Sequence, residues 1–85
     1  KTIHKFVLNA RKNVHIFPKG HKVLSFGMQH DDIVLWVLLD DSLPNTEERV
    51  FEVYGTGWEV DDRNSEFCGT VQNQDGLVFH VFENR

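Results

Sequence analysis

Gly55, Thr56, Gly57 and Trp58 form the segment of the sequence best suited to contact a ligand. Two glycines after an expected strand would let backbone N–H groups approach an anion, and the Trp58 indole offers a face for stacking. Thr56 could add a hydroxyl group. Phosphate loops of the known types continue into a helix, whereas an acidic segment follows here. The alternative interpretation is a bend that the glycines permit and that exposes Trp58.

Basic side chains are concentrated at the start of the chain. Residues 1–30 contain six Lys or Arg and no Asp or Glu, whereas residues 31–85 contain thirteen Asp or Glu and three Arg. This asymmetry favours a charged partner, unless basic and acidic strands simply pair across a sheet. For an anionic ligand, we expect Arg11, Lys19 and Lys22 to supply positive charge beside residues 55–58. No cofactor is expected.

The acidic remainder of the chain supports a second interpretation. Its carboxylates could imitate a phosphate backbone and dock on a basic partner protein. The side chains expected on such a surface are Asp31, Asp32, Glu59, Asp61, Asp62 and Glu66. The net charge of −4 argues against general binding to duplex nucleic acid. Both interpretations describe binding.

No combination of residues predicts catalysis or a metal site. The five histidines form no HxH or HExxH pattern, and a metal site would require folding to bring His4, His15 and His80 together. Cys68 is the only cysteine, so an intrachain disulfide is impossible, and we expect it to be a small core residue. The serines lack the GxSxG elbow of hydrolases. The sequence therefore predicts a protein that is not an enzyme.

The hydrophobic pattern predicts one mainly β domain over residues 1–85, with about seven short antiparallel strands in a small sandwich or barrel. Residues 33–39 are apolar throughout, which predicts a strand buried on both faces with Trp36 in the core. In residues 21–29, alternation places Leu24 on the same side as Phe26 and Met28. At most one helical turn is expected, near residues 43–48 or 61–66. Alternating segments occupy residues 3–9, 14–17, 21–29, 48–54, 67–72 and 77–83.

Residues 58–66 are polar and acidic, and they form a connection that is long for a compact domain and is a candidate functional loop. No apolar stretch approaches the length of a membrane span, and the lack of a disulfide fits a reducing compartment. We therefore expect a cytoplasmic protein with no membrane partner. A domain of this size without disulfides or metals is often stabilised by self-association, so we also expect a homo-oligomer.

Four stretches together resemble a known family. They are the run from Phe17 to Ser25, the central Leu35-Trp36, the turn from Tyr54 to Gly57 and the ending from Gly76 to Glu83. These stretches span nearly the whole chain and resemble an uncharacterised family of small bacteriophage and prophage proteins with a domain of unknown function. That family has no established active-site residues, so the resemblance implies no catalytic positions here.

The resemblance implies a viral origin and, by analogy, a counter-defence role in the cytoplasm of an infected bacterial host. The first hypothesis is a non-enzymatic protein that sequesters an anionic nucleotide immune signal. The alternatives are an anti-CRISPR-type inhibitor that binds a bacterial defence protein through the acidic surface, and a structural or regulatory phage accessory protein.

Overall fold

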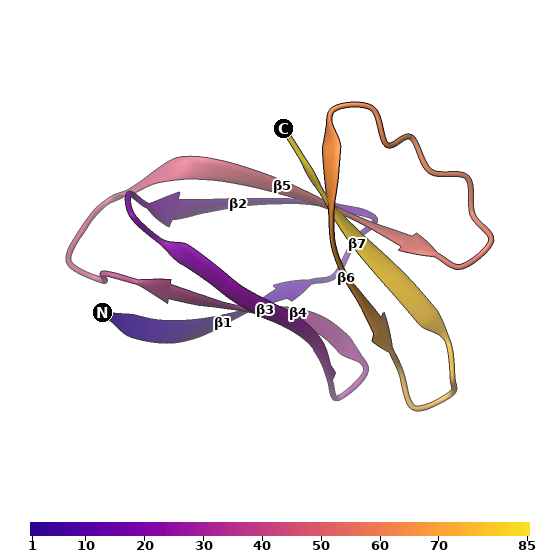
Figure 1. Cartoon of the computed structure of the whole chain (residues 1–85). Coiled ribbons are helices and arrows are strands. Elements are labelled where there is room, and N and C mark those ends of the chain that lie inside the picture. The colour runs from indigo at the N-terminus through magenta and orange to yellow at the C-terminus, as the bar shows by residue number, and fades with distance from the viewer.

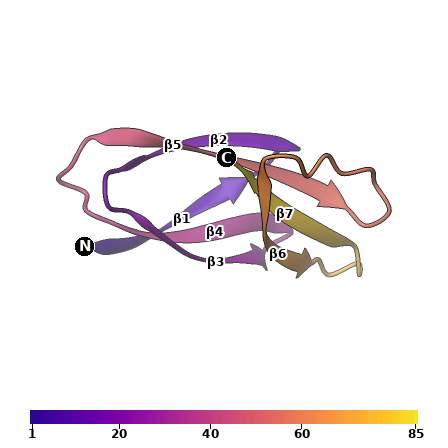
Figure 2. The same cartoon turned by 45° about the horizontal axis from the view of Figure 1, so that its top comes forward.

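The computed structural model describes residues 1–85 and contains seven antiparallel β-strands in two sheets. The smaller sheet has the order β1-β4-β3 and the larger has the order β2-β5-β7-β6 (Figure 1). The sheets stack without closing into a barrel, as Figure 2 shows, so the predicted mainly β class is confirmed as a sandwich. The chain has no helix, and so no helical segment that could cross a bilayer. The strands are β1 (Thr2–Leu8), β2 (Lys12–Pro18), β3 (Lys22–Gln29), β4 (Asp32–Leu39), β5 (Asn45–Gly55), β6 (Ser65–Gln72) and β7 (Val78–Asn84).

The core between the sheets is built from the inward side chains of alternating strand residues. Phe17, Leu35, Phe51 and Val81 are each 1% exposed or less. The Phe51 ring meets Phe26 of the opposite sheet edge to face, with 5.6 Å between ring centroids. Fully burying side chains of this size stabilises the fold by about 1.5–3 kcal/mol each. These contacts hold the two sheets together without a disulfide.

The prediction that Trp36 lies in the core is wrong. Strand β4 is the central strand of the smaller sheet, but alternation turns Trp36 to the outer face, where it is partly exposed. Its ring lies over Gly27 of β3, where a Cβ atom would be only 2.9 Å from Cζ3 of the indole. Lys5 of β1 donates a hydrogen bond to Gln29 of β3, which spans β4 and helps to cover Val34. The outer face of this sheet is thus partly covered by its own side chains.

A β-bulge in β3 changes which side chains face the core. The register with β4 shifts between Val23 and Ser25. Val23 therefore packs against the core with Phe26 and Met28, while Leu24 is exposed. The expected grouping of Leu24 with Phe26 and Met28 is wrong because it assumed unbroken alternation, which the extra residue of a bulge interrupts.

No helical turn forms at residues 43–48 or 61–66, the two places where at most one was expected. Residues 43–48 overlap β5, which begins at Asn45, and residues 61–66 lead from a loop into β6. The preceding loop, residues 56–64, is long for a topological reason. Both β5 and β6 are antiparallel to β7, so they run in the same direction and the loop must carry the chain back. Figure 1 shows this return from the end of β5 to the start of β6.

Candidate functional site

Successive turns of the first five strands lie at alternate ends of the sandwich. Arg11 lies between β1 and β2, at the end of the sandwich where β5 also finishes, and it shares a hollow with Trp58. Lys19 and Lys22 lie at the opposite end of β2, whose seven residues span roughly 20 Å. One chain therefore brings together only part of the predicted site: Arg11 shares a hollow with Trp58, whereas Gly55 and Thr56 line a different hollow with Trp58.

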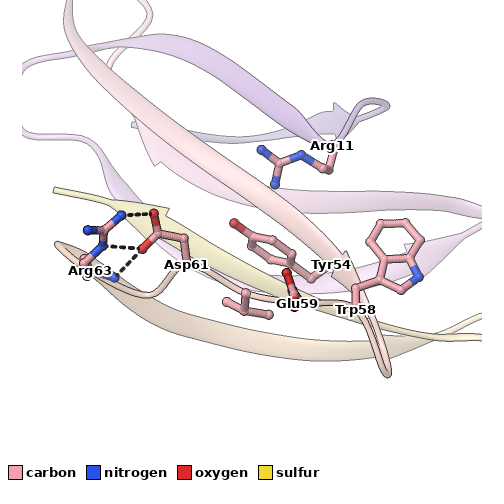
Figure 3. A pocket seen from close by; sticks show the side chains of 7 residues that line it. Arg11, Tyr54, Trp58, Glu59, Asp61 and Arg63 are labelled. Atoms are coloured by element: carbon pink, nitrogen blue, oxygen red, sulfur yellow. Dashed lines mark hydrogen bonds and ion pairs between the residues drawn. The ribbon is translucent and has the colours of Figure 1, made fainter.

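Arg11, Tyr54 and Trp58 line a hollow of about 740 Å³ (Figure 3). The guanidinium carbon of Arg11 lies 5.0 Å from the centroid of the Tyr54 ring, a distance suited to a cation–π contact. The volume falls within the range of small-molecule sites, about 300–1,000 Å³. The other lining side chains come from the returning loop and are Glu59, Val60, Asp61 and Arg63.

Glu52 fixes Arg11 and Tyr54 in place. Its Oε2 accepts hydrogen bonds from the Tyr54 hydroxyl at 2.5 Å and from Arg11 Nη1 at 2.9 Å, and its Oε1 accepts one from Asn84 Nδ2 at 2.6 Å. The bonds from Tyr54, Asn84 and Arg11 hold the pKa of Glu52 below its usual value. The carboxylate in turn raises the pKa of Tyr54. Because Arg11 is half-exposed, its other N–H donors stay available to a ligand.

Residues 55–58 form a tight turn. The Trp58 N–H donates to the Gly55 carbonyl at 3.1 Å, and Gly57 has a positive φ of 90°. The Trp58 ring lies against Gly55, where a Cβ atom would be 2.7 Å from Cε2. Trp58 is still 56% exposed, so part of its indole can accept a stacking partner.

Thr56 is already engaged within the protein. Its N–H donates to the Val78 carbonyl at 3.2 Å, and its Oγ1 lies 2.8 Å from His80 Nε2. The N–H of Gly57 has no partner in the chain. The exposed part of the Trp58 ring and the Gly57 N–H are therefore the groups of this segment that remain available to a ligand.

The hollow carries no net positive charge within one chain. Arg63 forms two hydrogen bonds of 2.9 Å with Asp61, and this guanidinium lowers the pKa of Asp61 to about 2. Arg11 is paired with Glu52, and Glu59 adds another carboxylate to the lining. An anionic ligand would therefore need positive charge from elsewhere.

A second hollow of about 400 Å³ opens at the same end of the sandwich. Asp31 and Asp32 stand there with Arg11 and Trp58. Its apolar lining includes Leu8, Met28, Ile33, Val53 and Phe79.

The six carboxylates of the expected acidic surface do not form one patch. Asp31 and Asp32 line the second hollow, Glu59 and Asp61 line the first, and Asp62 lies on the returning loop. Glu66 lies on β6, where it pairs with Arg85.

The three histidines that a metal site would require are not gathered at one place. His4 Nε2 lies 2.8 Å from Asp41, His15 stacks on Phe17, and His80 sits between Thr56 and Thr70. No group of three His, Cys, Asp or Glu side chains could hold a metal ion.

Cys68 lies at the bulge of β6 and packs against the core without being fully buried. Burial raises the pKa of its thiol to about 11, and the nearby carboxylates of Glu83 and Glu66 add to the effect. The thiol is therefore protonated at neutral pH and is a poor nucleophile.

Sequence reasoning missed Tyr54, Asp61 and Arg63 as parts of the first hollow, and Glu52 as the group that holds Arg11 and Tyr54. Alternation in residues 48–54 does place Glu52 and Tyr54 on one face. No sequence signal indicates that Arg11 covers that face, because the contact depends on the pairing of β2 with β5.

The chain is a small antiparallel β-sandwich with two hollows at one end, both lined by Arg11 and Trp58. The chain belongs to the family of a domain of unknown function, DUF7352, whose model matches residues 1–85. A search of curated proteins and a search of solved structures each find no match to the chain.

Proposed function

We propose that this protein is a non-enzymatic binding protein that sequesters an anionic nucleotide signal, as a phage-encoded counter-defence factor in the cytoplasm of an infected bacterium. The observation that carries the proposal is the hollow in which Arg11 and Trp58 lie around Tyr54. A base would stack on the exposed part of the indole, and a phosphate would accept hydrogen bonds from Arg11 and from the Gly57 N–H. The viral context is supported by the resemblance of four sequence stretches to small phage proteins.

Calorimetry on nucleotide-free protein with cyclic di-AMP and ADP-ribose tests this proposal. We expect Trp58→Ala and Arg11→Ala each to weaken binding of the recognised nucleotide by about tenfold, the equivalent of one lost stacking or charged contact. Trp36→Phe and Arg85→Ala are matched controls, because both residues lie outside the hollow, and these variants should bind as the wild type does. Wild-type protein that binds neither nucleotide would refute the proposal.

A second candidate function is an inhibitor of the anti-CRISPR type, which docks on a basic defence protein. The observation in its favour is the second hollow, where Asp31 and Asp32 stand beside an apolar lining. A Lys or Arg side chain would pack its aliphatic stem there and present its charge to the carboxylates. The double variant Asp31→Lys, Asp32→Lys should abolish inhibition, while Asp61→Lys should weaken it less because Arg63 already pairs with that carboxylate. Unchanged inhibition by the double variant would exclude this candidate.

A further inference from the structure

Strand β2 is an edge of the larger sheet with unpaired backbone groups along its free side. The Val53 N–H donates to the Arg11 carbonyl at 2.8 Å. This bond shows which residues of β2 form hydrogen-bonded pairs with β5, because such pairs alternate along an antiparallel ladder. Odd-numbered residues of β2 bond to β5, while Lys12, Val14 and Ile16 turn their N–H and C=O groups away from it. No other backbone or side-chain group in the protein bonds to them.

The features that protect an edge strand lie only at the ends of β2, Lys12 at its start and Pro18 at its end, and its centre has none. The edge strand β1 carries a lysine at its centre, and the edge strands β3 and β6 are each interrupted by a bulge. By contrast, β2 is irregular only between Phe17 and Pro18, at its end. Its outward side chains Val14 and Ile16 are 53% and 52% exposed. A regular, apolar edge of this kind is a template for a further strand.

We infer that the β2 strands of two copies pair antiparallel about a two-fold axis at Val14, which makes the protein a homodimer with one continuous sheet. In this register Val14 lies opposite the partner's Val14, and Lys12 lies opposite the partner's Ile16. Each free N–H and C=O of Lys12, Val14 and Ile16 then gains a hydrogen-bond partner.

Charge complementarity favours a second copy as the occupant of this edge. Within one chain, Ile16 pairs with Glu48 of β5, so these two side chains lie next to each other on the outer face. The partner's Lys12 would lie on the other side of Ile16, within reach of the Glu48 carboxylate. The two-fold axis repeats this pair, and no like charges are placed directly opposite each other.

The same pairing brings together predicted binding residues that lie at opposite ends of a single chain's sandwich. Arg11 directly precedes β2 and Lys19 directly follows it, so antiparallel pairing places the partner's Lys19 at the end of the strand pair where Arg11 and its hollow lie. The partner's Lys22 belongs to the same end of the sandwich. A second copy thereby supplies the positive charge that the hollow lacks. This shared site rests on the proposed function, whereas the strand pairing does not.

Sedimentation equilibrium of the full chain, over about 1–500 μM, tests the pairing. We expect the wild type to dimerise. Val14→Pro removes an N–H that faces away from β5, so it leaves the β2–β5 ladder intact. Val14→Lys places two ammonium groups opposite each other across the two-fold axis. Both variants should dimerise at least about tenfold more weakly, and Val14→Thr, which keeps the strand and the N–H, should dimerise as the wild type does. Circular dichroism checks that each variant is folded. A wild type that stays monomeric, or folded Pro and Lys variants that both dimerise normally, would overturn the inference.

Mixing two variants that each bind nucleotide weakly tests the shared site. Arg11→Ala and Lys19→Ala should each lose cyclic di-AMP or ADP-ribose binding by about tenfold, yet both should remain dimers. An equimolar mixture should recover about a quarter of the wild-type sites, because half of the dimers are mixed and each mixed dimer has one intact site. A dimer that binds no nucleotide would refute the proposed function but not the pairing. A monomeric Val14→Pro that binds nucleotide at full affinity would refute the shared site but not the proposed function.

Discussion

Replacing Glu52 tests whether one carboxylate organises the Arg11 hollow. Glu52→Ala removes hydrogen bonds from Tyr54, Arg11 and Asn84 at once. At about 1 kcal/mol for each bond, and with water replacing part of the loss, we expect unfolding free energy to fall by about 2–3 kcal/mol. For a domain of this size that corresponds to a fall in Tm of about 10–20 °C. Glu52→Gln keeps one acceptor oxygen for Tyr54, and Asn84 can turn its own carbonyl oxygen toward the new NH2 group. The variant then loses mainly the exposed ion pair to Arg11, so it should cost about 0.5–1 kcal/mol.

Urea unfolding of both variants, with Glu48→Ala as the control, measures these differences. Glu48 lies on the same strand, is exposed and makes no hydrogen bond through its side chain. The native pKa of Glu52 is lowered, so its contribution is complete above the unfolded pKa and is lost as pH falls through the native pKa. The difference between the wild type and Glu52→Gln should therefore shrink in acid. If Glu52→Ala costs no more than Glu48→Ala, or if Glu52→Gln costs as much as Glu52→Ala, the hydrogen-bonding argument fails.

Three further substitutions or reactions probe single features of the structure. Asp31 has a positive φ of 68°, so Asp31→Gly should raise unfolding free energy by about 0.5–1 kcal/mol, measured in urea; a loss of stability would contradict the strained turn. Gly55→Ala places a Cβ atom against the Trp58 ring, so it should displace the indole and cost about 1–3 kcal/mol, with a changed Trp fluorescence spectrum as the direct readout. Cys68 should react with a thiol reagent at pH 8 at least tenfold more slowly than in the urea-unfolded chain, because its pKa is raised to about 11; equal rates would refute the argument from burial.

The strands could be predicted from the sequence because alternation and turn residues are local signals. Segments such as residues 3–9 and 77–83 lie within about a residue or two of β1 and β7. The errors arose where a non-local contact decides the outcome. Trp36 sits in an apolar run, but only the other sheet determines which side of β4 is inside. Leu24 is turned outward by a bulge that depends on pairing with β4.

The candidate site was predicted less well because antiparallel topology separates residues that are close in sequence. Lys19 and Lys22 follow Arg11 closely in sequence, yet a whole strand lies between them and Arg11. Counting turns along the expected strands would have indicated this separation, since the connections at the two ends of a strand lie at opposite ends of the sandwich. The position of the returning loop over Tyr54 could not be found in this way, because the order β5-β7-β6 is not a local property of the sequence.

Lysines that form no ion pair in their own chain can be tested for a role in ligand binding without a large effect on the stability of the fold. Lys12 lies opposite Glu52 in the β2–β5 ladder, but that carboxylate bonds to Tyr54, Arg11 and Asn84, so Lys12 forms no ion pair within its own chain. Lys19 lies in an exposed turn and forms no ion pair with any carboxylate of its own chain. Lys19→Ala should therefore change unfolding free energy by less than about 0.5 kcal/mol, as expected for an exposed side chain without partners. A loss of nucleotide affinity in that variant would then reflect the ligand site and not the fold. A large loss of stability in urea would instead show that Lys19 has a structural partner, and it would remove this residue from the shared site.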